Sequence, residues 1–189
     1  MKKITICLLA LLMVFTLTSC GGGDDTVPAG YQLASNSDVC DYLLYVPDTW
    51  ITESGTPTNF TEATVAPGDK CNVSLMPVEA VYAETVADYW AEQQAEYERL
   101  FGAITVSEEG GEVTLGSGEK KVSGYRYVFT AKYGEGETAT DYKFMQIFFL
   151  KHNAVSGSSL YVFTYTATAD HYDSHLEAVN GILTNFSFK

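Results

Sequence analysis

Two histidines near the C-terminus have a spacing that can bind a metal ion. His171 and His175 are four residues apart in a segment expected to be helical, where such a spacing places both imidazoles on one side. Asp170 adds a neighbouring carboxylate, but the sequence places no further ligand, and a metal site needs more than two. A solvated histidine beside one at the edge of the core explains the same pattern. His171 and His175 are thus the metal candidates, but no bound metal or cofactor is predicted.

The acidic clusters are weaker candidates for a metal site. Glu108, Glu109 and Glu112 form one group and Glu135 and Glu137 another, and neither has the order of oxygens of a calcium loop. Hairpin turns explain both. The sequence also lacks Gly-x-Ser-x-Gly, a phosphate-binding glycine loop, Cys-x-x-Cys and His-Glu-x-x-His, so no catalytic residue is predicted.

Cys20 has the surroundings of a lipid-attachment site. Leu17-Thr18-Ser19-Cys20 follows an apolar run that begins at Ile4 and precedes three glycines, as in a bacterial lipobox. The run is shorter than the roughly 20 residues that span a bilayer. We expect a signal peptide at residues 1–19, acyl chains such as palmitate on Cys20, and anchoring on the extracytoplasmic face of the cell membrane. An ordinary secretory signal would leave the glycines unexplained.

Cys40 and Cys71 remain in the exported chain. Both fall on the apolar phase of expected strands, and two cysteines in an exported domain favour one disulfide. We predict a Cys40–Cys71 bridge. Two buried free thiols are the alternative that the sequence leaves open.

The charge of the mature chain limits its partners. Loss of Lys2 and Lys3 leaves 9 basic residues against 24 acidic ones, a net charge of −15. Nucleic acids and anionic lipid headgroups are excluded, because both require clustered Lys and Arg. Positive surfaces and divalent cations remain compatible, although scattered carboxylates that keep the protein soluble explain the charge equally well.

The chain divides into a tether and one domain. Residues 20–30 comprise the lipidated cysteine and a flexible Gly-rich segment, whose ten glycine-led residues reach roughly 17 Å. Residues 31–189 form a single domain with an expected radius of gyration of about 15 Å. The domain is therefore expected to work close to the membrane surface.

Hydrophobic periodicity predicts an α+β fold. Expected strands lie at residues 40–46, 60–65, 71–75, 104–106, 113–115, 125–133, 142–150 and 160–167, with turns at 53–58, 67–69, 108–111 and 134–136. A helix is expected from Thr85, with Asp88 completing a capping box and Gly102 ending it, and a last helix from Asp170. Two strands apolar on both faces indicate a central antiparallel β-sheet covered by helices on both faces.

Tyr45-Val46-Pro47-Asp48-Thr49-Trp50 resembles the PsbP-like (Mog/PsbP) family, whose first long strand ends in an aromatic residue, a Pro and a Trp. Further similarities to PsbP-related lipoproteins of Gram-positive bacteria lie at residues 72–74, 142–146, 161–166, 169–172 and 185–188. The resemblance covers Tyr31 to the end. It implies an α/β/α sandwich and a non-catalytic accessory role. The matching residues mark the fold, so no binding residue is transferred.

Three classes of function compete. A non-catalytic, membrane-tethered binding or adaptor domain explains the lipid, the short tether and the missing catalytic motifs, and we favour it. A ligand- or metal-capturing lipoprotein that uses the acidic surface and His171/His175 is the alternative. An extracytoplasmic hydrolase would need a nucleophile and a base that meet only in the fold. We expect a neutral or basic protein partner near the membrane, and the sequence leaves the oligomeric state open.

Overall fold

The protein is described by a computed structural model at residues 26–52, 58–78, 85–134, 136–153 and 157–189. The predicted signal peptide, Cys20 and most of the tether lie outside these ranges, as does most of the turn expected at residues 53–58. Within them, no helix has the length and apolar character needed to cross a membrane.

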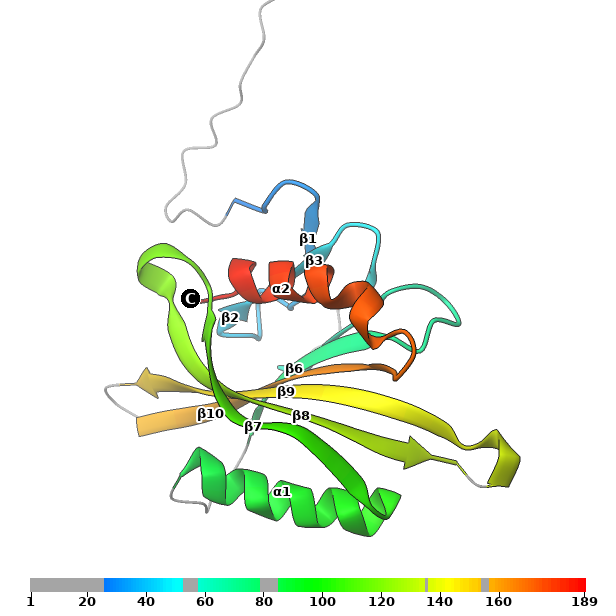
Figure 1. Ribbon diagram of the computed structural model, residues 1–189. Helices are drawn as coiled ribbons and strands as arrows, with labels where there is room; N and C mark the ends of the chain where they lie inside the picture. Colours follow the sequence, from blue (N-terminus) through cyan, green and yellow to red (C-terminus); the bar gives the residue numbers. More distant parts are fainter. Residues whose placement is uncertain (1–25, 53–57, 79–84, 135, 154–156) are drawn as a thin grey trace, which may run out of the picture.

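A seven-stranded antiparallel sheet forms the middle of the domain (Figure 1). Its strands are β4 (Ile51–Thr52), β5 (Thr61–Thr64), β6 (Asn72–Val78), β7 (Ile104–Leu115), β8 (Val122–Tyr133), β9 (Thr140–Asn153) and β10 (Gly157–Thr168). They are hydrogen-bonded in the order β4-β5-β6-β10-β9-β8-β7. This sheet with its two α-helices is an α+β architecture, as the sequence predicted.

Helix α1 (Val86–Phe101) lies below the sheet in Figure 1. The predicted cap is confirmed, because the Thr85 side chain accepts a hydrogen bond from the Asp88 backbone N–H at 3.1 Å. Gly102 ends the helix with a φ of 79°, a conformation that favours glycine. The residues buried between α1 and the sheet are Trp90, Tyr127, Phe129, Phe148, Leu160 and Val162. Leu100, in the last turn of the helix, is 56% exposed.

Short elements and a second helix lie above the sheet in Figure 1. They are β1 (Tyr31–Leu33), β2 (Tyr42–Leu43), β3 (Tyr45–Pro47), the 3-10 turn η3 (Tyr172–His175), α2 (Leu176–Asn185) and β11 (Ser187–Phe188). β1 pairs with β3, and β11 pairs with β2. The larger apolar cluster of the domain lies here and includes Phe149, Phe163, Ile182 and Phe186. Alternate residues of β9 and β10 therefore pack into opposite clusters, which explains why both strands are apolar on both faces.

The single strand predicted at residues 40–46 is wrong. This segment forms β2 and β3, which lie outside the seven-stranded sheet and are interrupted at Leu44. The Ser35 hydroxyl accepts from the Leu44 N–H at 3.1 Å and donates to the Tyr42 carbonyl at 3.2 Å. A side chain thus satisfies backbone groups that a continuous strand ladder would otherwise pair.

Two further predicted boundaries are corrected. Residues 104–115 form one strand, because Gly110, with a φ of 69°, lies where the β7–β8 register shifts, so the chain bulges without turning back. The last helix begins at Leu176 and not after Asp170, because Tyr172–His175 form a 3-10 turn. The remaining 3-10 turns are η1 (Gly118–Lys120) and η2 (Gly136–Thr138).

Candidate functional site

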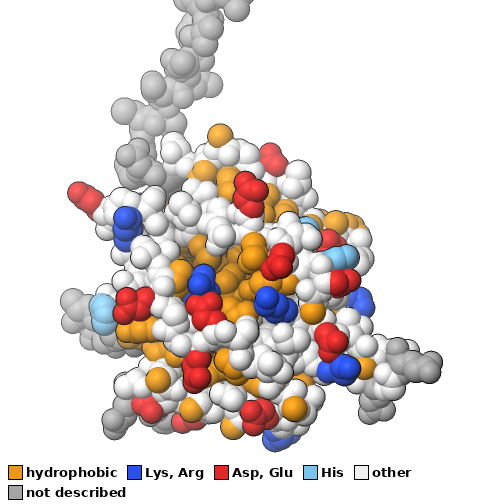
Figure 2. All heavy atoms as spheres, in the orientation of Figure 1, with side chains coloured by type: hydrophobic (Ala, Val, Ile, Leu, Met, Phe, Trp, Pro, Cys, Tyr) orange, Lys and Arg blue, Asp and Glu red, His pale blue; other side chains and the backbone are white. Residues whose placement is uncertain are grey.

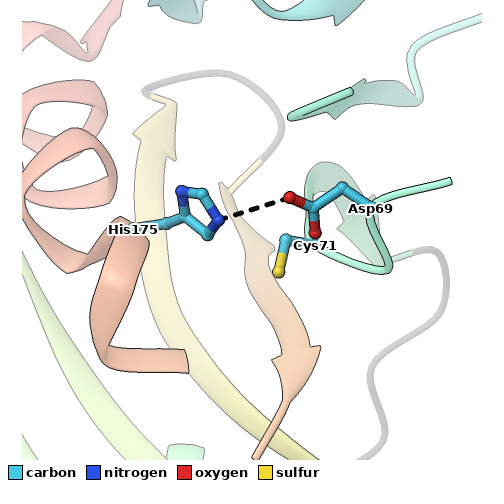
Figure 3. A group of neighbouring side chains, drawn as sticks. All are labelled: Asp69, Cys71 and His175. Atoms are coloured by element: carbon cyan, nitrogen blue, oxygen red, sulfur yellow. Dashed lines mark ion pairs between the residues drawn. The ribbon is translucent and has the colours of Figure 1, made fainter. Parts of the chain in front are cut away.

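The two histidines that the sequence paired do not form one site. His171 is 61% exposed, and its Nε2 lies 3.9 Å from Asp170 Oδ2. His175 instead lies with its Nε2 3.5 Å from Asp69 Oδ2 (Figure 3). The 3-10 turn explains the difference, since its three residues per turn do not align positions four apart as an α-helix does.

His175 belongs to a cluster with Asp69 and Cys71 (Figure 3). The carboxylate, sulfur and imidazole atoms that could bind an ion all lie within 4.8 Å of one another. Asp69 is held in the turn between β5 and β6, where its N–H donates to the Ala66 carbonyl at 3.1 Å. Cys71 directly precedes β6, and its carbonyl accepts from the Val65 N–H at 3.1 Å. A hydrogen-bonded turn, the start of β6 and the end of η3 thus bring three potential ligands together.

Burial differs within this cluster. Cys71 is fully buried, whereas the Asp69 and His175 side chains are each 23% exposed. Burial, reinforced by the neighbouring Asp69 carboxylate, raises the pKa of the Cys71 thiol to about 12. Asp69 Oδ1 is buried and has no hydrogen-bond partner among the residues that the structure describes. The cluster therefore contains a protonated thiol and an unsatisfied carboxylate oxygen.

Trp50 supports the imidazole of His175. The two rings meet edge to face with their centroids 6.5 Å apart, and Trp50 is only 6% exposed. Trp50 ends the segment that resembles the PsbP-like family, so this fold marker also packs against the cluster. Sequence reasoning missed Asp69 because it lies about a hundred residues from His175 and was interpreted only as part of a turn.

The predicted disulfide is absent, because Cys40 and Cys71 are both free, buried thiols. The Cys40 sulfur lies 3.8 Å from the Thr58 carbonyl and 3.9 Å from the Thr61 hydroxyl. Cys71 lies beside Asp69, at the other end of β5. The prediction failed because it placed Cys40 in a strand of the main sheet, which the segment does not join.

A second feature is a notch where β8 and β9 diverge. Their pairing ends at Gly124↔Phe149, while β9 continues beside β10 as far as Asn153. A hollow of about 550 Å³ lies here. Its lining includes the apolar or aromatic residues Val86, Val122, Tyr125, Phe148, Phe149, Leu150 and Phe188 and the basic residues Lys121, Lys151 and His152.

The notch combines an apolar floor with fixed positive charge. Tyr125 and Leu150 are 43% and 38% exposed. The Lys151 ammonium donates to Asp41 Oδ2 at 2.8 Å and lies 4.8 Å from the centre of the Phe188 ring. On the face shown in Figure 2, acidic and basic side chains are interspersed around apolar surface. The notch therefore presents basic side chains beside apolar surface, and Asp41 pairs with one of them, Lys151.

The comparisons with known proteins concern the fold. No family model and no curated protein matches the chain. Among solved structures, LpqN of Mycobacterium tuberculosis, involved in cell envelope biogenesis, is similar with a TM-score of 0.50 and 15% identity over 78% of this chain and 83% of LpqN. The Ran-binding protein Mog1p of Saccharomyces cerevisiae has a TM-score of 0.48 and 11% identity over 78% of this chain and 90% of Mog1p.

The likeness to LpqN shows a shared fold. At 15% identity it transfers neither site nor function. Together with the seven-stranded antiparallel sheet and two α-helices, it supports the α+β fold that the sequence predicted.

Proposed function

We propose that this chain is a membrane-tethered extracytoplasmic lipoprotein whose domain is a non-catalytic accessory module that binds a protein partner. The lipobox at Cys20 supports the tether. The involvement of LpqN in cell envelope biogenesis is compatible with an accessory role at this location. We also propose that the domain is an α/β/α sandwich of the type that PsbP-related lipoproteins of Gram-positive bacteria have.

We infer partner binding from the notch between β8 and β9. Two strands that diverge leave room for an extended segment to lie along a sheet edge, a common mode of peptide recognition. Tyr125 and Leu150 offer partly exposed apolar surface for its side chains. Lys121 suits an acidic group on that segment, whereas Lys151 is already paired with Asp41, and the overall charge favours a neutral or basic partner.

The Asp69–His175–Cys71 cluster supports a non-catalytic role. A carboxylate, an imidazole and a thiol in proximity resemble the components of a cysteine nucleophile. A reactive cysteine, however, has a lowered pKa and is accessible to substrate. Burial raises the pKa of Cys71 to about 12, and the residue is fully buried, so its thiol is protonated and shielded at neutral pH.

Site-specific photocrosslinking tests partner binding in the native membrane. A photoreactive residue in place of Tyr125, at the notch, is compared with one in place of Tyr133 at the other end of β8, where the side chain is 65% exposed. We expect one reproducible protein adduct from position 125 and little from position 133. Equal capture at both positions, or none at position 125, contradicts the proposed surface.

Two further measurements test the remaining parts. Cys20→Ala should move the protein from the membrane fraction to the soluble fraction, and mass spectrometry of the wild type should show added lipid. A variant that still pellets, with no lipid on the wild type, contradicts the tether. Saturable hydrolysis of an ester, peptide or glycoside that is lost on a single substitution would favour the hydrolase.

A further inference from the structure

We propose that Asp69, Cys71 and His175 form a binding site for a divalent transition-metal ion of the zinc class. The site lies away from the notch, in the cluster of Figure 3, and it does not depend on a protein partner. It also replaces His171, which the sequence suggested as a ligand, by a carboxylate and a thiol from a distant turn.

The distance between Asp69 and His175 fits two ligands of one ion. With zinc bonds of about 2.1 Å to oxygen and nitrogen, adjacent ligand atoms of a tetrahedral site lie about 3.4 Å apart. Asp69 Oδ2 and His175 Nε2 are 3.5 Å apart, at the limit for a direct hydrogen bond. Because all three ligand atoms lie within 4.8 Å of one another, a small side-chain adjustment brings the Cys71 sulfur into the same shell.

The unsatisfied oxygen of Asp69 is an independent sign of a missing partner. Asp69 Oδ1 is buried without a hydrogen bond among the described residues, which is costly for a carboxylate oxygen. A cation held by this carboxylate would remove that cost. Trp50 against His175 restricts the imidazole in the way that supporting residues orient metal ligands.

The donor set selects the class of ion. Magnesium and calcium prefer oxygen ligands, and copper(I) prefers sulfur, whereas zinc accepts thiolate, imidazole and carboxylate together. Binding requires Cys71 to release its proton to solvent, since the thiolate is the ligand. Three protein ligands leave a fourth position for water or a partner side chain. Asp69 also lines a hollow of about 370 Å³, through which an ion can reach the site.

Cobalt(II) serves as the spectroscopic probe for this site. The full-length, untagged protein is purified from membranes in detergent, reduced, stripped with a chelator and titrated with cobalt(II). We expect a thiolate-to-cobalt charge-transfer band, the intense visible bands of a tetrahedral ion, saturation at a single ion per chain and displacement by zinc. Cys71→Ser should abolish the charge-transfer band. Asp69→Asn and His175→Gln should each weaken binding about 100-fold or more, since even supporting residues alter affinity by about 10–100-fold.

Two matched variants separate the site from other effects. Cys40→Ser removes the other buried thiol, and His171→Gln removes the neighbouring exposed imidazole, so both should bind cobalt like the wild type. If Cys71→Ser fails to fold, the Asp69 and His175 variants, at partly exposed positions, still decide the matter. A wild type without the thiolate band, a band that survives in Cys71→Ser, or affinity unchanged in both Asp69→Asn and His175→Gln overturns the proposal.

Discussion

Both faces of the central sheet carry aromatic side chains, but different elements cover them. Helix α1 covers one face, and irregular structure with α2 covers the other. One amphipathic helix covers the first, with Trp90 stacked on Tyr127 at a centroid distance of 4.5 Å. Short strands, a 3-10 turn and α2 cover the second. Asp69, Cys71 and His175 come from turns and element ends that border this irregular cover. Regular packing thus stabilises one face, while irregular connections bring polar groups together beside the other.

The largest loss of stability is expected for Trp90, the buried side chain through which α1 packs on the first face. Trp90 is 2% exposed and contacts the rings of Tyr127 and Phe129, so Trp90→Ala should destabilise the domain by about 3–5 kcal/mol. Urea unfolding of the purified protein measures this loss. Leu100→Ala, on the same helix but 56% exposed, is the control and should change stability by less than about 0.5 kcal/mol. Equal losses for the two variants would mean that Trp90 does not anchor α1.

The same contrast explains what the sequence could predict. Thr85 with Asp88 at one end and Gly102 at the other encode α1 locally, so its existence and both ends were predicted. Leu44 could not be assigned correctly, because the break there depends on the side chain of Ser35, nine residues earlier. Gly110 signalled a turn, but its conformation serves a bulge equally well. Alternation encodes which face a residue occupies and not which strand lies beside it.

The candidate cluster was even less accessible to sequence reasoning. His175 was identified for its spacing from His171, and that spacing assumed an α-helix where the structure has a 3-10 turn. Cys71 was identified as a cysteine but assigned the wrong neighbour, because the position of Cys40 relative to the sheet is a tertiary feature. Residues far apart in the chain form the cluster, so only the fold reveals it.

Removing one buried hydroxyl on each face of the sheet should cost an intermediate amount of stability, and the two losses should differ. The Tyr42 hydroxyl, beneath the irregular cover, lies 2.7 Å from the Asn59 carbonyl, 2.8 Å from the Thr61 hydroxyl and 3.1 Å from the Leu75 carbonyl. Tyr42→Phe leaves these buried groups short of a partner and should cost about 1–3 kcal/mol.

Tyr97→Phe is the matched change on the α1 face. The Tyr97 hydroxyl interacts with the Gln146 amide, whose nitrogen also donates to the Thr164 hydroxyl at 3.3 Å. Because Gln146 keeps this second partner, the loss should be near about 1 kcal/mol. Urea unfolding of both variants gives the order, and a larger loss for Tyr97→Phe would reverse the proposed difference between the covers.

The smallest effect concerns a charged contact at the rim of the irregular cover, and it should depend on pH. Burial alone would raise the pKa of Asp41, but hydrogen bonds from Lys151 and Tyr161 outweigh it and hold the pKa below its ordinary value. The Lys151 ammonium lies 2.8 Å from Asp41 Oδ2, and the Tyr161 hydroxyl donates to the same carboxylate at 2.8 Å. A carboxyl group with a lowered pKa stabilises the fold above its unfolded pKa of about 3.9, and this contribution is lost as pH falls through the folded value.

Lys151→Met should therefore destabilise the protein at pH 7 by less than about 1 kcal/mol, because Asp41 is half exposed and solvent weakens the pair. The difference from the wild type should shrink in acid, below the folded pKa of Asp41, where this carboxyl is protonated in both proteins. Lys132→Met is the control, since Lys132 and Asp141 are 3.8 Å apart and both mostly exposed, and it should have no measurable effect. Urea unfolding at the two pH values provides the measurement. A loss for Lys151→Met that is the same at both would assign the contribution of Lys151 to its ammonium over the Phe188 ring, 4.8 Å from the ring centre, and not to its pair with Asp41.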